Sequence, residues 1–114
     1  GKAYEGRKDL GNVYSGDGIR FKGRGLIQIT GRTNYAEVSE ALKQDFIKHP
    51  EYLALPLYAV HSACWWWHSR ELNALADKKD FRKITRIING GYNGYDDRLF
   101  WYDRAKHVLT NKTV

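Results

Sequence analysis

Apolar residues recur at intervals of three and four positions along most of the chain after residue 33, the spacing that predicts helices. The first helix begins near Thr33, a candidate N-cap, and its apolar stripe extends to Leu42. The second covers about residues 57–69 and is apolar nearly all round, which is typical of a central helix. Pro56 directly precedes it and suits the first turn of a helix.

Three further elements are predicted in the last third of the chain. Residues 71–77 form a short helix or turn. Asp80 is a good N-cap for a helix over residues 81–88, and Gly90 fits a left-handed C-cap at its end. A last amphipathic helix covers about residues 96–109, with an apolar stripe of Leu99, Tyr102, Ala105 and Leu109. The pattern as a whole predicts a mainly α-helical fold.

The stretch from residue 16 to residue 35, GDGIRFKGRGLIQITGRTNY, has a different pattern that predicts a short β element near residues 26–30. Gln28 and Thr30 lie two positions apart, so in a strand they face one side, while Ile27 and Ile29 face the interior. Asn34 follows the next turn and can reach back to the same polar face. With four glycines within ten positions before it, this strand is predicted to floor a groove for a polar ligand.

A plainer interpretation of the same stretch stays open. Glycine-rich turns commonly precede strands, and Gln, Thr and Asn side chains at a surface commonly contact only water. The glycine spacing matches neither the dinucleotide fingerprint nor the phosphate loop, because no Gly-Lys-Ser/Thr sequence follows and no strand clearly precedes it. A nucleotide site is therefore disfavoured.

Composition limits the classes of partner. A chain of 114 residues with 42% hydrophobic residues has the size of one domain with a modest core. Its net charge of +6 favours nucleic acid, anionic lipid or anionic bacterial wall polymers. The basic residues are scattered without a nucleic-acid-binding motif, and no apolar run approaches the roughly 20 residues that span a bilayer, so neither nucleic acid nor a membrane span is expected. Because the chain begins with GKA, we expect a piece of a longer protein.

Three side chains on the helix predicted over residues 57–69 are weak candidates for metal ligands. His61, Cys64 and His68 share one face, but they form an incomplete zinc set among aromatic neighbours. Neither a metal nor another cofactor is therefore expected, and Cys64 is an equally weak nucleophile. Asp17, between two glycines, is interpreted as a turn residue whose side chain accepts nearby backbone N–H groups.

Several stretches together resemble the glycoside hydrolase family 19 proteins in their phage and prophage endolysin branch. They are YEGRKDLGN, GDGIRFKGRGLIQITGRTNY, SACWWW with LNALAD, and TRIINGGYNGYDDR, and they occur in the family's order. The resemblance covers about residues 4–109 and is most specific in the GRGLIQITGRTNY part. It implies one lysozyme-like, mainly α-helical domain over residues 1–114, with a long cleft that cuts β-1,4 links in chitin or peptidoglycan.

The resemblance also implies a mechanism and a set of site residues. Family 19 enzymes act with inversion and use two carboxyl groups, a protonated acid and a base that activates water. Carried over by position, Glu5 in YEGR matches the general base; without the match, a solvated or Arg7-paired surface carboxylate would be expected. The residues that match sugar-binding positions of the cleft are Gln28, Thr30, Asn34, Asn89 and Arg98.

One departure from the family concerns the general acid. In the family this Glu lies upstream of everything present in this sequence, so we expect the chain either to be a fragment of a longer enzyme, truncated at its amino terminus, or to be a shortened relative. Loss of a positioned acid commonly costs about 10²–10⁴-fold in rate, and nothing in the spacing favours Asp9 or Asp17 as a substitute. A catalytically inactive sugar-binding remnant is therefore an alternative to a hydrolase.

The substrate expectation comes from the resemblance and the charge. Asn93 stands where chitinases of the family often carry Glu, which together with the basic charge favours peptidoglycan over chitin. We expect a monomeric, muramidase-type endolysin domain, with a chitinase as the alternative. Such a phage or prophage protein stays in the bacterial cytoplasm until its release to the cell wall or periplasm, or is secreted.

Overall fold

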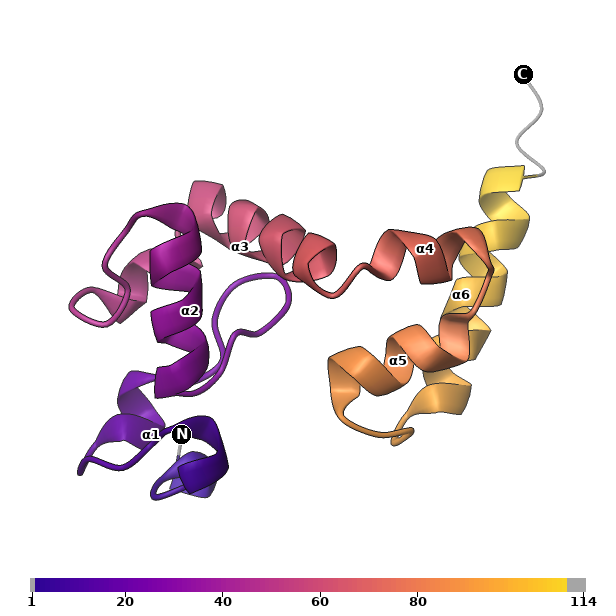
Figure 1. Cartoon of the computed structure of the whole chain (residues 1–114). Coiled ribbons are helices and arrows are strands. Elements are labelled where there is room, and N and C mark those ends of the chain that lie inside the picture. The colour runs from indigo at the N-terminus through magenta and orange to yellow at the C-terminus, as the bar shows by residue number, and fades with distance from the viewer. Residues whose placement is uncertain (1, 111–114) are drawn as a thin grey trace. The chain divides into compact units, whose positions relative to one another are not determined.

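The computed structural model describes residues 2–110, and this part of the chain contains six α-helices (Figure 1). They are α1 (Asp17–Arg20), α2 (Arg32–Leu42), α3 (Pro56–Ser69), α4 (Leu72–Asp77), α5 (Phe81–Asn89) and α6 (Tyr95–Thr110). Three short 3-10 helices precede or separate them: η1 (Lys2–Tyr4), η2 (Lys8–Leu10) and η3 (Pro50–Ala54). The predicted mainly α-helical fold is confirmed.

The chain divides into two compact units. The first unit extends to Arg70 and contains α1 to α3, and the second unit begins at Glu71 and contains α4 to α6. The expectation of one domain over residues 1–114 stays a prediction. Over residues 2–110, no helix has the length and apolar character needed to cross a membrane.

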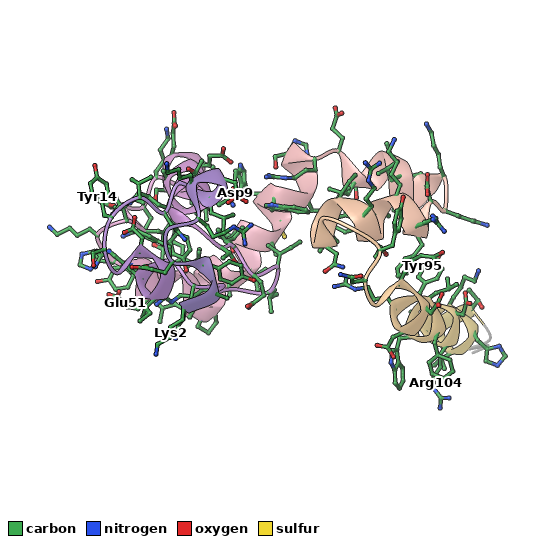
Figure 2. All side chains as sticks on the ribbon, turned by 90° about the horizontal axis from the view of Figure 1, so that it is seen from below. Lys2, Asp9, Tyr14, Glu51, Tyr95 and Arg104 are labelled. Atoms are coloured by element: carbon green, nitrogen blue, oxygen red, sulfur yellow. The ribbon has the colours of Figure 1, made fainter. Side chains whose placement is uncertain are left out.

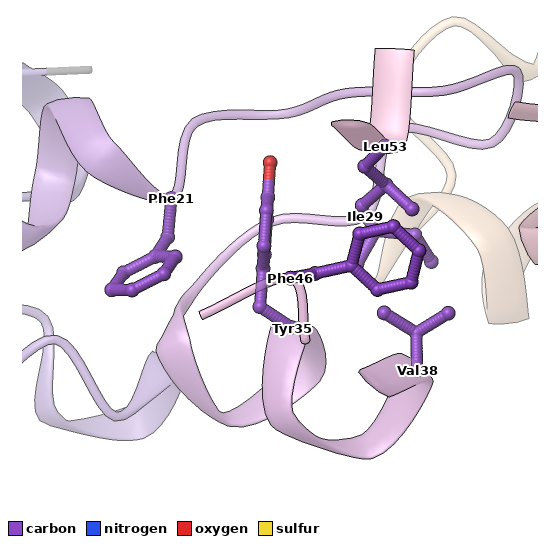
Figure 3. Packing of buried hydrophobic residues seen from close by; sticks show 6 residues of the cluster. All are labelled: Phe21, Ile29, Tyr35, Val38, Phe46 and Leu53. Carbon is purple, nitrogen blue, oxygen red and sulfur yellow. The ribbon is translucent and has the colours of Figure 1, made fainter. Parts of the chain in front are cut away.

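The core of the first unit is built around α2 (Figure 3). Its buried apolar side chains come from the loop before α2, from α2 itself and from the segment after it: Phe21, Ile29, Tyr35, Val38, Phe46 and Leu53. Phe21 and Tyr35 pack edge to face with ring centres 5.1 Å apart. The Tyr35 hydroxyl donates to the carbonyl of Lys22 and accepts from Arg24, so this buried polar group is satisfied.

Helix α3 packs on this core with one face. Ala59 and Ser62 are its buried residues, and its bounds and its Pro56 start agree with the prediction. Leu57 and Val60 are exposed, so the predicted central position of this helix does not hold within the first unit. The helix carries apolar residues on all its sides, but the first unit packs against only one of these sides.

The start of α2 differs from the prediction. Gly31, rather than Thr33, is the N-cap residue, and no local side chain accepts the first N–H groups of the helix. Asn12, which lies 20 residues before Arg32, takes this role instead: its Oδ1 accepts the Arg32 N–H at 2.9 Å. Gly11 and Gly31 allow the segment around residue 11 to pass close to the start of α2, because a Cβ on Gly11 would lie 2.0 Å from the Thr33 Oγ1.

The β element predicted near residues 26–30 is present only as a bridge. Arg24 and Ile29 pair as an isolated antiparallel bridge, and residues 25–28 form a turn between them. Gln28 has a φ of 58°, a left-handed conformation that a strand does not contain. The expected strand floor is therefore not formed, but Ile29 is buried in the core and Ile27 packs against it, as the alternation predicts.

The second unit packs α5 against α4 and α6. Its buried residues are Leu72, Ile84 and Thr85. Phe81 stacks on Tyr102 of α6 with ring centres 4.4 Å apart. Of the predicted apolar stripe on α6, Leu99 and Tyr102 are half-buried, whereas Ala105 and Leu109 are exposed.

The ends of α5 follow their predicted signals. The Asp80 side chain accepts the N–H of Lys83 at 3.1 Å, which caps the first turn. Gly90 ends the helix with a φ of 75°, the left-handed conformation expected of a C-cap glycine. Both predictions are confirmed, because these signals act within one helical turn of the residues they control.

Candidate active site

Glu5, the residue predicted to be the general base, is held by the turn that begins α1. Its Oε2 accepts the backbone N–H of Gly16 at 2.9 Å, and its Oε1 accepts the backbone N–H of Gly18 at 2.7 Å. Each carboxylate oxygen therefore has one backbone donor, which fixes the orientation of the group. The side chain is exposed, so water can reach it.

These contacts set the charge of Glu5. The hydrogen bonds from Gly16 and then Gly18 lower the pKa of Glu5 below its ordinary value of 4.5, against smaller opposing effects of desolvation and of the Asp17 charge. Glu5 is therefore ionised at neutral pH, as a base must be. Of the two plainer alternatives, the pair with Arg7 is wrong, since Arg7 binds Asp9 through contacts of 2.8 and 2.7 Å. The other, a solvated surface carboxylate, stays open because Glu5 is exposed.

Asp17 is buried within the same turn. Its Oδ2 accepts the Tyr14 N–H at 3.1 Å, as expected of a turn residue. The sequence did not predict its second partner: Arg32 donates from Nε and Nη2 to the two carboxylate oxygens, both at 2.9 Å. Asp9 and Tyr14, both labelled among the side chains of the first unit in Figure 2, are exposed. Asp17, in contrast, is buried.

Neither Asp9 nor Asp17 is suited to the role of general acid. A general acid must be protonated at the working pH, which requires a raised pKa. The hydrogen bond from Arg7 lowers the pKa of Asp9, and the hydrogen bonds from Arg32 lower the pKa of Asp17. Both groups are therefore ionised, and each is held in an ion pair with an arginine.

The structure brings Gln28, Thr30 and Asn34 together through a chain of hydrogen bonds. The Asn34 amide donates to the Thr30 carbonyl at 2.7 Å, and the Thr30 hydroxyl donates to the Gln28 carbonyl at 3.0 Å. The Gln28 amide donates to the carbonyl of Gly25 at 2.9 Å. Gly23 lies beside two of these side chains, because a Cβ there would stand 2.6 Å from Gln28 Oε1 and 3.1 Å from Thr30 Oγ1.

Asn89 and Arg98, the other predicted sugar-binding residues, belong to the second unit. Asn89 ends α5, and its amide donates to the Asn93 carbonyl at 2.8 Å across the loop before α6. Arg98 lies in α6 beside a cavity of about 380 Å³ between α5 and α6, whose lining includes Trp101 and Tyr102. Asn89 is not part of that lining.

The candidate metal ligands on α3 do not form a centre. Over residues 2–110, no three or more His, Cys, Asp and Glu side chains gather in a way that could hold a metal ion. His61, Cys64 and His68 are each exposed on α3.

Comparison with known proteins identifies relatives of this chain. A "Glycosyl hydrolase family 19 domain-containing protein" of Haemophilus influenzae is 43% identical over 111 residues, which are 96% of this chain and 52% of that protein. An "Endochitinase" of Pisum sativum is 32% identical over 119 residues, covering 81% of this chain and 37% of the relative. An "Acidic 27 kDa endochitinase" of Solanum lycopersicum is 30% identical over the same length and is covered to 48%.

The chain is thus a relative of proteins named as family 19 glycosyl hydrolases and endochitinases. It spans about half the length of the first relative and less of the two plant proteins. No family model matches the chain.

Proposed function

We propose that this chain is the base-bearing part of a family 19 glycoside hydrolase that cleaves β-1,4 links in bacterial peptidoglycan. The observation that carries the proposal is the geometry of Glu5, whose carboxylate is oriented by two backbone N–H groups and exposed to water. The names of the relatives support the reaction class.

In the proposed mechanism Glu5 removes a proton from a water molecule that attacks the sugar carbon from the face opposite the leaving group. Glycosidases that invert use carboxyl groups about 6.5–9.5 Å apart, which leaves room for this water. The lowered pKa of Glu5 suits the base and not the acid. Because Asp9 and Asp17 are held ionised, the proposal uses neither as the acid and, following the family resemblance, assigns the acid to a segment upstream of Glu5.

The amide and hydroxyl groups of Gln28, Thr30 and Asn34 are proposed to bind the sugar. The side-chain amides of Gln28 and Asn34 donate to backbone carbonyls, and their side-chain oxygens are hydrogen-bond acceptors. These oxygens can accept from sugar hydroxyl or acetamido groups. Asn89 and Arg98 are proposed to contact the polymer from the second unit.

Peptidoglycan is proposed as the polymer because the net charge of +6 attracts the anionic bacterial wall. The endochitinase names of the plant relatives favour chitin as the second candidate. We further propose that this is a phage or prophage protein that stays in the bacterial cytoplasm until it is released to the cell wall, or is secreted. We propose that it acts as a monomer.

The test measures binding and cleavage of purified peptidoglycan oligomers and of chitin oligomers by this chain. Binding needs no general acid, so the chain should bind peptidoglycan oligomers more tightly than chitin oligomers. Any cleavage product should carry N-acetylmuramic acid at its new reducing end. Tighter binding of chitin would favour a chitinase, and binding of neither oligomer would contradict the proposal.

A further inference from the structure

The turn that orients Glu5 is itself tied to the first residue of α2. Gly16 and Gly18 donate to Glu5, and the residue between them, Asp17, is only 2% exposed. Both Asp17 oxygens bind the Arg32 guanidinium. The two residues that donate to Glu5 therefore lie on either side of Asp17, which is anchored to α2 by its ion pair with Arg32.

Arg32 is held firmly enough to serve as this anchor. Its guanidinium carbon lies 4.7 Å from the ring centre of Tyr14 and 4.8 Å from that of Phe21, within the range of cation–π contacts. Phe21 is a fully buried member of the core. The two-fold contact with Asp17 uses the planar fork of arginine, which lysine lacks.

A second tie joins the segment that carries Glu5 to the same residue. The buried Asn12 donates from Nδ2 to the carbonyl of Tyr4 at 2.9 Å and accepts the Arg32 N–H with Oδ1 at 2.9 Å. Tyr4 directly precedes Glu5. The backbone of Arg32 thus fixes the Glu5 segment, and its side chain fixes the turn that binds the Glu5 carboxylate.

Arg32 also neutralises a charge that opposes Glu5. Asp17 is close enough for its negative charge to disfavour ionisation of Glu5. The ion pair with Arg32 compensates that charge at contacts of 2.9 Å. Loss of the Arg32 side chain would leave a buried carboxylate unpaired beside the proposed base.

We propose that Arg32 is a positioning residue for Glu5, acting through Asp17 to aim the Gly16 and Gly18 N–H groups at the Glu5 carboxylate and to compensate the Asp17 charge. The contacts are observed in the structure. Their role in catalysis rests on the proposed function. Arg32 itself does not contact the reacting atoms in this proposal.

The direct test follows the Glu5 carboxyl carbon by NMR during a pH titration of the whole chain, with the Glu5 signal assigned by its loss in Glu5→Gln. In Arg32→Gln the turn loosens and Asp17 is unpaired, so the pKa of Glu5 should rise toward 4.5. In Arg32→Lys, which keeps the charge but loses the fork, the rise should be smaller. Arg7→Gln removes an exposed arginine–aspartate pair and should leave the pKa of Glu5 unchanged.

Circular dichroism establishes that each variant is folded. If Arg32→Gln does not fold, Arg32→Lys decides: a raised pKa of Glu5 supports the proposal. An unchanged pKa of Glu5 in a folded Arg32→Gln variant, or in Arg32→Lys when the glutamine variant is unfolded, overturns it.

A catalytic readout separates this inference from the proposed function. On an activated aryl glycoside, Arg32→Gln should lower kcat by about 10- to 100-fold with a smaller change in KM, because the base is misplaced while sugar contacts remain. The acidic limb of its pH profile should move to higher pH. If Glu5→Gln is as active as the wild type, the proposed function fails, while the NMR titration still decides whether Arg32 positions Glu5.

Discussion

Gly23 stands beside two side chains proposed to contact sugar. A Cβ at this position would meet the flexible end of Gln28 at 2.6 Å and the hydroxyl of Thr30 at 3.1 Å. The lack of a side chain at residue 23 therefore lets both groups lie against the backbone. The glycines of this stretch allow close approach between the chain's own segments, as Gly11 and Gly31 also show.

Replacement of Gly23 should weaken sugar binding more than stability. Gly23→Ala should displace the Gln28 amide and lower oligosaccharide affinity about tenfold, while the free energy of unfolding changes by about 1 kcal/mol or less, because the clash is with a movable side-chain end. Calorimetric titration and thermal denaturation measure the two quantities. Gly91→Ala is the control, because its Cβ would meet no atom within 4 Å. Unchanged affinity in Gly23→Ala would argue against Gln28 as a sugar contact.

The lowered pKa of Asp17 makes stability depend on acid. Because Arg32 lowers the pKa of this buried group in the folded chain, its stabilisation is complete above the ordinary value of 3.8 and is lost as pH falls through the lower folded value. The melting temperature of the wild type should therefore fall below about pH 3.8 more steeply than that of Asp17→Asn, which has no charge to lose. Melting curves from pH 2 to pH 7, roughly the range in which carboxylates titrate, check this. Parallel pH dependences of the two proteins would contradict it.

At the scale of elements, the ends of α5 are capped by residues adjacent in the sequence, whereas the start of α2 is capped by a distant residue. Asp80 and Gly90 act within a turn of the helix they bound, so the sequence pattern is sufficient to predict them. Thr33 carries an equally good local signal, but the partner of the Arg32 N–H is Asn12, 20 residues earlier. No periodicity relates these two positions, so only the folded chain reveals the cap.

Substitutions at Asn12 and Thr33 should separate the long-range cap from the local signal. Asn12→Ala leaves the Arg32 N–H and the Tyr4 carbonyl without their buried partner and should lower the free energy of unfolding by about 2 kcal/mol. Thr33→Ala should lower it by about 0.5 kcal/mol or less, since Thr33 is exposed and does not cap the helix. Urea denaturation measures both changes. An equal loss in the two variants would contradict the cap assigned to Asn12.

The contrast between local signals and distant partners also explains why the β element was predicted only in part. Alternation correctly predicts that Ile27 and Ile29 face the core, because these apolar side chains pack against the interior whether the backbone forms a strand or a turn. It does not predict that residues 25–28 turn back so that Arg24 pairs with Ile29. The left-handed conformation of Gln28 closes this turn, and propensity alone does not favour it for glutamine.

At the scale of the whole molecule, sequence motifs located the candidate site but not what holds it together. The resemblance supplied Glu5, Gln28, Thr30 and Asn34, and the structure places all four in the first unit. The Asn12 and Asp17 contacts with Arg32 join residues 20 and 15 positions apart, and no motif predicted them. Asn89 and Arg98 belong to the second unit, where their role stays a prediction.

The central claim is that Glu5 acts as the base of a glycosidase, and a leaving group that needs no proton tests it most directly. Dinitrophenyl β-glycosides of the preferred oligosaccharide bypass the general acid, so their hydrolysis by this chain depends on the base. Glu5→Gln should lower kcat by about 100-fold or more, whereas Glu40→Gln, which changes an exposed residue of α2, should match the wild type. Equal hydrolysis by a folded Glu5→Gln variant and the wild type would contradict the claim.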